Sequence, residues 1–291
     1  MRGCWDLRQS RPVTAPPGPR PPLDPDALAT GLVPLGLRLE LVVTTASTNA
    51  LAAEHVRAGA SPGLVVVAEE QTGGRGRLDR RWETPPGTAA VYSCVLAPEV
   101  PAASWPWLPL LTGLATARTL RRHGVDGGVK WPNDVLVDDR KISGILVERV
   151  DGPRGPVAVV GVGVNADLRE DELPVPTATS VGLVTGRPVD RTALLVGLLT
   201  DLVAAHEDWV AVGGADRLRA AYARECVTVG RQVRVALPGE QELRGLARTV
   251  DATGRLVVRT DDGQDVAVAA GDVVHVRPRP AATPPSAGFL G

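Results

Sequence analysis

The sequence predicts an α/β (α+β) fold in which a mixed β-sheet with helices packed on one side precedes a small β-barrel module. Two features of the sequence support this fold class. Between residues 35 and 226, short runs of β-branched residues alternate with longer stretches of helical character. From residue 227 onward only short strand-like runs remain, separated by turns that carry Gly or Asp, which is typical of a small all-β barrel.

Runs rich in β-branched residues predict the strands of the sheet. A hairpin is predicted within VLVDDRKISGILVERV, where VLV and KISGILVERV flank a tight turn at DDR. The other predicted strands are LRLELVV (37–43), LVVVAEEQ (64–71), AAVYSCVL (89–96) and PVAVVGVGVN (156–165).

Capping residues and a glycine stop predict the helices between these strands. Ser47 and its two neighbours offer hydroxyl and amide caps for one helix, and Asp190 offers a cap for another. Gly124 follows a cationic last turn and marks a helix end. We expect helices at residues 49–59, 106–123, 191–211 and 215–225.

The two ends of the chain differ from its centre. Residues 1–34 are rich in Pro and Arg, residues 279–291 are rich in Pro and Ala, and neither segment shows hydrophobic periodicity, so we expect both to be disordered. A large domain at 35–226 and a β module at 227–278 lie between them. No helix-turn-helix pattern precedes residue 40, which argues against a transcriptional regulator.

Charge, hydropathy and cysteine content exclude several classes of protein. The net charge of −1 gives no reason to expect nucleic acid or a membrane surface as a partner. No apolar run approaches the ~18–20 residues that cross a bilayer, and the N-terminus lacks the apolar core of a secretory signal. Cys4, Cys94 and Cys226 are too few and too far apart for a disulfide framework or a zinc cluster. We therefore expect a cytoplasmic protein.

The segment QTGGRGRLDRRW, from Gln71 to Trp82, is a candidate binding loop for a phosphate-bearing anion. Its three glycines allow backbone N–H groups to approach a ligand closely. Its four arginines face a single acidic residue, Asp79. No Lys-Ser/Thr pair follows the last glycine, so this is not a Walker loop. Taken alone, the pattern also fits an exposed, solvated turn.

Two further segments carry residues suited to a binding site. Lys130 and Lys141 are the only lysines among 32 basic residues, which points to a use for a compact charge in place of the planar guanidinium. Asn133 and Asp134 can hydrogen-bond a sugar or orient a metal-bound water. Two glycines within GVGVN (161–165) predict a bulge or a close backbone approach.

Together these segments resemble the biotin–protein ligases (holocarboxylase synthetases), in the form without an N-terminal DNA-binding domain. The resemblance rests on Ser47-Thr48-Asn49, AEEQTGGRGRLDRRW, KWPNDVLVDDRKISGILVE and GVGVN in this order, and it covers the chain from about residue 40 to about residue 277. It implies a seven-stranded mixed sheet with helices on one side, then an SH3-like barrel. It also implies an enzyme that joins biotin to ATP as biotinyl-5′-AMP and then transfers biotin to a lysine of a biotin carboxyl carrier domain of acetyl-CoA or acyl-CoA carboxylase.

The resemblance implies roles for individual residues. The positive charges of the catalytic residues would neutralise the repulsion between the biotin carboxylate and the α-phosphate. Mg²⁺ would be held mainly by the phosphates of ATP. The implied catalytic residues are Lys141, Arg75 and Arg77; those for biotin are Ser47, Thr48, Asn49, Gln71, Arg75, Gly76, Arg77 and Lys141; those for ATP are Gly74, Arg77, Lys130, Asn133, Asp134 and Asn165.

One position departs from the family pattern, because Asp79 stands where the loop usually has a glycine. Two other functions therefore stay open. A lipoate or octanoate protein ligase would share the catalytic fold, although the GRGR segment and the C-terminal β module argue against it. A non-catalytic biotin-binding protein would result if Asp79 disables the loop. The sequence also leaves open whether the chain forms a homodimer.

Overall fold

The computed structural model describes residues 20–77, 80–237, 241–269 and 271–276. Its larger sheet follows the order β1-β2-β4-β8-β7-β6-β5, with β3 pairing to β2. Among the strand pairs of the described residues in this sheet, only β1 and β2 are parallel, so the expected mixed sheet is confirmed. The strands are β1 (Arg38–Thr45), β2 (Leu64–Arg75), β3 (Arg81–Thr84), β4 (Ala89–Leu96), β5 (Gly128–Lys130), β6 (Asp134–Val137), β7 (Arg140–Gly152) and β8 (Gly155–Asn165).

The predicted hairpin is present as β6 and β7. Asp138 and Asp139 form its turn, and both have positive φ angles, which short polar side chains tolerate better than most. The predicted strand at 64–71 is longer in the structure, because β2 continues to Arg75 and pairs there with β3. Part of the expected loop is therefore a two-stranded extension of the sheet.

Helices cover both faces of the sheet, which corrects the expectation that they pack on one side. Helices α1 (Pro25–Leu32), α3 (Trp107–Arg122) and α5 (Arg191–Val210) lie over the same face. Helix α2 (Thr48–Arg57) buries Ala52, Ala53 and Val56 against the opposite face. Successive side chains along a strand point to opposite faces of the sheet, so both faces can be buried. Val65 and Val67 pack in the core with α1, α3 and α5, whereas Val66 packs in the core with α2. Short α4 (Val181–Thr185) and α6 (Gly214–Glu225) complete the domain.

The segment 1–34 was expected to be disordered, and this is wrong for its described part, residues 20–34. Asp24 caps α1 by accepting hydrogen bonds from two backbone N–H groups, and Pro25 occupies the first turn, where it is tolerated. Leu28 and Leu32 are fully buried where α1 contacts α5. Tertiary burial thus stabilises a helix too short to be stable alone. Residues 1–19 and the tail 279–291 lie outside the described residues.

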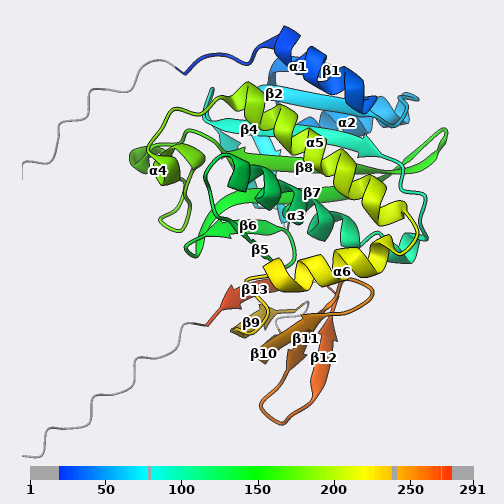
Figure 1. The fold of residues 1–291 in the computed structure, drawn as a ribbon, viewed down its shortest axis with the longest axis vertical. Helices are drawn as coiled ribbons and strands as arrows, with labels where there is room; N and C mark the ends of the chain where they lie inside the picture. Colours follow the sequence, from blue (N-terminus) through cyan, green and yellow to red (C-terminus); the bar gives the residue numbers. More distant parts are fainter. Residues whose placement is uncertain (1–19, 78–79, 238–240, 270, 277–291) are drawn as a thin grey trace, which may run out of the picture.

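The smaller sheet is antiparallel and follows the order β12-β11-β10-β9-β13, which confirms the expected β module. It lies beside β5 and α6 (Figure 1). Two indoles join it to the larger domain: Trp107 Nε1 donates to the Ala252 carbonyl at 2.9 Å and Trp131 Nε1 to the Gly254 carbonyl at 3.0 Å. Its strands are β9 (Gln232–Ala236), β10 (Glu242–Val250), β11 (Leu256–Arg259), β12 (Asp265–Val268) and β13 (Asp272–His275).

None of the described helices is long and apolar enough to cross a membrane.

Burial of α1 predicts a stability difference between two truncations. Leu28→Ala removes a fully buried side chain and should lower the free energy of unfolding by about 2–5 kcal/mol. Val33→Ala, at a side chain that is 71% exposed, should change it by no more than about 0.5 kcal/mol. Urea denaturation of both variants measures the difference, and equal midpoints would contradict the docking of α1.

Candidate active site

One pocket collects nearly all of the residues that the sequence implicated. It lies over the sheet where β2, β3, β7 and β8 meet the start of α2, and it is closed on one side by β13. The implicated residues that line it are Ser47, Thr48, Asn49, Gln71, Arg75, Gly76, Arg77, Lys130, Asn133, Asp134 and Lys141.

Two implicated residues, Gly74 and Asn165, do not line this pocket. Gly74 is enclosed: a Cβ there would lie 2.8 Å from Gln71 Nε2 and would also overlap the carbonyl of Trp82. Its lack of a side chain allows β3 to pair closely with β2. Asn165 is buried, and its Nδ2 donates to the Thr179 carbonyl at 2.9 Å, which ties the end of β8 to the following segment.

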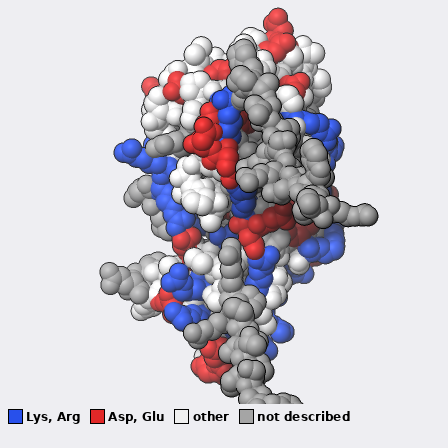
Figure 2. All heavy atoms as spheres, turned by 90° about the vertical axis from the view of Figure 1, so that its left-hand side faces the viewer, with Lys and Arg blue, Asp and Glu red and all other residues white. Residues whose placement is uncertain are grey.

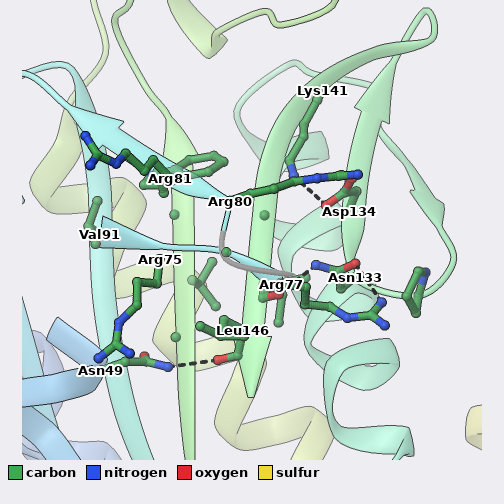
Figure 3. A pocket seen from close by; sticks show the side chains of 18 of the residues that line it. Asn49, Arg75, Arg77, Arg80, Arg81, Val91, Asn133, Asp134, Lys141 and Leu146 are labelled. Carbon is green, nitrogen blue, oxygen red and sulfur yellow. Dashed lines mark hydrogen bonds and ion pairs between the residues drawn. The ribbon is translucent and has the colours of Figure 1, made fainter. Parts of the chain in front are cut away.

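One end of the pocket is formed by buried polar side chains at the start of α2, and Arg75 lies beside Asn49 there (Figure 3). Thr48 lies at the start of α2, and its backbone N–H donates to Gln71 Oε1 at 2.7 Å. Ser47 caps the same helix, with its Oγ accepting from the Ala50 N–H at 3.4 Å. Asn49 uses its amide internally, because Nδ2 donates to the Leu146 carbonyl and to Glu148 Oε2. Burial of these polar side chains suits recognition of a small polar group removed from water.

The other end of the pocket brings together Arg77, Arg80 and Lys141 (Figure 3). Arg77 Nη1 donates to Asn133 Oδ1 at 3.4 Å, and burial lowers the pKa of the Arg77 guanidinium. Lys141 Nζ lies 2.6 Å from Asp134 Oδ1. Arg80 forms an ion pair with Asp272 of β13. Lys141 and Arg80 are therefore held by internal carboxylates, which an anionic ligand can replace.

Trp82 is a pocket residue that the sequence reasoning did not assign. A Cβ at Gly163 would lie 2.5 Å from its indole, and a Cβ at Gly144 would lie 3.0 Å from it, so the ring rests on the backbone of β7 and β8. Lys141 Nζ lies 5.6 Å from the ring centroid, within range of a cation–π contact. The close approach predicted from GVGVN is confirmed, and β8 pairs with both neighbours without a bulge.

The smaller sheet also contributes to the pocket, through Gly271, Asp272 and Val273. Sequence reasoning missed these residues because no local pattern links β13 to the loop that it faces. Its contact with the larger domain is reinforced by His275, whose Nε2 lies 3.1 Å from Thr228 Oγ1. Thr228 Oγ1 in turn accepts a hydrogen bond from the backbone N–H of Trp131 at 3.1 Å. Asp79, whose effect on the loop was an open question, lies outside the described residues.

Comparison with known proteins agrees with this architecture. Residues 41–165 match the Biotin/lipoate A/B protein ligase family, and residues 228–276 match the Biotin protein ligase C terminal domain. A biotin--[acetyl-CoA-carboxylase] ligase of Mycobacterium tuberculosis is 38% identical, over 89% of this chain and 97% of its own. The chain belongs to the biotin protein ligase family. The resemblance inferred from the sequence is thus confirmed.

Other members of the family extend the agreement. A biotin--[acetyl-CoA-carboxylase] ligase of Paracoccus denitrificans is 34% identical, over 79% of this chain and 98% of its own. The structure of the Aquifex aeolicus biotin protein ligase in complex with biotin and ATP has a TM-score of 0.71 and 25% identity, covering 82% of this chain and 99% of that chain. The match of the C-terminal domain favours a biotin protein ligase over a lipoate ligase.

Close packing of Trp82 on β8 predicts the effect of one added methyl group. Gly163→Ala should displace the indole and raise the KM for biotin or ATP about tenfold, since overpacking costs about 1–3 kcal/mol. Gly73→Ala is the control, because its Cβ would meet the Ala46 carbonyl at 3.4 Å, an ordinary contact. Steady-state kinetics of both variants measure the effect, and equal KM values would show that the indole is not held by the glycine.

The His275 contact predicts a dependence of stability on pH. Burial, with nearby Lys130 and Arg231, lowers the pKa of His275 from 6.5 to about 4. Between these values the unfolded chain binds a proton that the folded ring resists, so stability falls as pH falls from about 6.5 to about 4. In His275→Gln the free energy of unfolding should decrease by about 2 kcal/mol less over this pH range, after allowance for solvent screening of a partly exposed ring. Urea denaturation across this range tests it; parallel curves for the two proteins would refute it.

Proposed function

We propose that this chain is an ATP-dependent ligase that activates biotin as biotinyl-5′-AMP and then transfers biotin to one lysine of a biotin carboxyl carrier domain of acetyl-CoA or acyl-CoA carboxylase. The observation that supports this most directly is that one pocket combines buried polar side chains with several cations. Thr48 and Gln71 are buried, uncharged and suited to the cyclic urea of biotin. Arg77 and Lys141 are cations suited to its carboxylate and to the phosphates of ATP.

The first step brings two anions together. A carboxylate oxygen of biotin attacks the α-phosphorus, the bond from that phosphorus to the β-phosphate bridging oxygen breaks, and pyrophosphate leaves. Positive charge close to both groups lowers this barrier: at an effective dielectric constant of 20, one pair of charges at ~4 Å contributes ~4 kcal/mol before desolvation. Lys141 is suited to this role because β7 and its ion pair with Asp134 hold it in place.

The second step is acyl transfer. The lysine amine of the carrier domain attacks the carbonyl carbon of the mixed anhydride, a C–N bond forms, the C–O bond to AMP breaks, and the amine loses a proton. No covalent enzyme intermediate is required. The adenylate is easily hydrolysed, so a pocket closed by Trp82 and β13 would serve to exclude water.

The donor set of the pocket fits Mg²⁺ held mainly by the substrate. Among the described residues, no group of three or more His, Cys, Asp or Glu side chains is placed to hold a metal ion. Asp134 and Asp272 are the carboxylates that line the pocket, and both are paired with cations. Mg²⁺ prefers octahedral oxygen ligands and commonly takes most of them from phosphates and water. When bound, it would neutralise charge on the phosphates, while Asp134, released from Lys141, could supply one oxygen.

We also propose that the protein acts in the cytoplasm without a nucleic-acid partner. The near-neutral net charge of −1 supports the absence of a nucleic-acid partner, because proteins that hold nucleic acid usually carry a basic surface. In Figure 2, basic and acidic side chains are interspersed over the face that is shown.

Mass spectrometry of a biotin carboxyl carrier domain tests the proposed ligase. After incubation with the protein, Mg²⁺-ATP and biotin, one lysine should gain the mass of a single biotinyl group. Parallel reactions with lipoate and octanoate should give no product. A carrier that gains lipoyl but not biotinyl would refute the assignment of substrate.

The same assay tests the cationic residues. Arg75→Ala and Lys141→Ala should each lower the rate of biotin-dependent pyrophosphate release at least about a hundredfold, because each removes a positive charge from the lining of the pocket. Arg149→Ala is a suitable control, since this arginine is exposed on β7 and pairs only with Asp151 and the Trp105 ring among the described residues. Full pyrophosphate release by both pocket variants would refute the roles assigned to them.

A further inference from the structure

Ser93 is a fully buried polar residue that touches two pocket residues yet does not line the pocket itself. It lies in the middle of β4, directly beneath the start of α2. Its Oγ is 2.7 Å from Thr48 Oγ1 and 2.6 Å from Asn49 Oδ1. A serine hydroxyl carries one proton, so it can donate to only one of these oxygens.

The surroundings of Asn49 decide where that proton goes. Asn49 Nδ2 faces two acceptors, the Leu146 carbonyl at 3.2 Å and Glu148 Oε2 at 2.7 Å. The amide cannot be turned over without placing its oxygen against both of them. Oδ1 therefore faces Ser93, and because Oδ1 can only accept, Ser93 must donate to it.

The direction of the next hydrogen bond follows. With its proton committed to Asn49, Ser93 Oγ accepts from the Thr48 hydroxyl at 2.7 Å. The alternative acceptor, Gln71 Oε1, is farther from that hydroxyl, at 3.1 Å, and already receives the Thr48 backbone N–H at 2.7 Å. Each donor in such a chain strengthens the next, so the order Thr48 to Ser93 to Asn49 is self-consistent.

We propose that Ser93 is a positioning residue that makes the Thr48 hydroxyl a hydrogen-bond acceptor toward the ligand, so that the pocket selects a ring N–H group at this point. The single proton of Thr48 points away from the pocket, and only lone pairs face a bound molecule. The inference rests on the proposed function, in which that N–H group belongs to the cyclic urea of biotin.

Removal of the Ser93 hydroxyl should weaken biotin binding selectively. Ser93→Ala leaves Asn49 Oδ1 without a donor in the protein interior and frees the Thr48 proton to turn toward Gln71 or the ligand. The Kd for biotin, measured by calorimetry, should rise about tenfold, while the KM for ATP should change by less than about twofold. Ser93→Thr keeps the hydroxyl and should restore the Kd to within about threefold of the wild-type value.

Ligand analogues separate this role from a merely structural one. Two analogues of biotin, each with an oxygen in place of one ring N–H group, lack one donor apiece. The wild-type protein should bind one of them at least about tenfold more weakly than biotin, and Ser93→Ala should reduce that ratio to about threefold or less. Loss of packing alone would weaken all three ligands by the same factor.

Ser180→Ala is the matched control. It removes another fully buried serine hydroxyl, which donates to the Leu168 carbonyl at 2.6 Å, outside the pocket. It should lower stability without changing the Kd for biotin. If Ser93→Ala and Ser180→Ala give the same Kd, or if analogue selectivity survives in Ser93→Ala, the inference is overturned while the proposed ligase stands. A wild-type protein that binds no biotin would instead overturn the proposed function, and this inference with it.

Discussion

The pocket depends on the bare backbone of β7 and β8 where Gly144, Gly161 and Gly163 lie. At Gly161 any Cβ would overlap the amide of Asn49, and at Gly163 it would overlap the Trp82 indole. The backbone of the sheet is therefore in direct contact with α2 at Gly161 and with the Trp82 indole at Gly163. The close approach of Asn49 to Gly161 fixes the start of α2, where Thr48 bonds to Gln71 and Asn49 bonds to Ser93.

Charge balance is the second constraint on the pocket. Four arginines within a dozen residues would repel one another, and the ion pair of Arg80 with an acid of another element offsets part of this repulsion. Asp134 on β6 holds Lys141, and Asp272 on β13 holds Arg80. Breaking these ion pairs costs free energy, but new ion pairs with the phosphate and carboxylate groups of a ligand offset this cost. The pocket is thus already shaped for anions, which reduces the ordering that binding requires.

Local patterns in the sequence predicted the fold well where local physics controls it. The strand Ala89–Leu96, the hairpin at Asp138–Asp139 and the cap of α2 follow from β-branched runs, turn residues and a capping hydroxyl. Helix α1 did not follow, because its start signals, Asp24 and Pro25, lie in a Pro-rich stretch and the burial of its two leucines depends on distant α5. Most of the pocket could be predicted because its residues lie in compact motifs. Trp82 and Asp272 could not, since their positions depend on strand pairing and on the docking of one sheet against another.

The contribution of β13 to the pocket has a consequence for engineering and for the divergence of these enzymes. The smaller sheet supplies Asp272 to Arg80, and it receives the Trp107 and Trp131 indoles on its Ala252 and Gly254 carbonyls. A chimera that joins residues 20–226 of this chain to the terminal module of another ligase must therefore match these contacts as well as the peptide junction. The two units are separate in topology, but the residues in contact between them constrain one another.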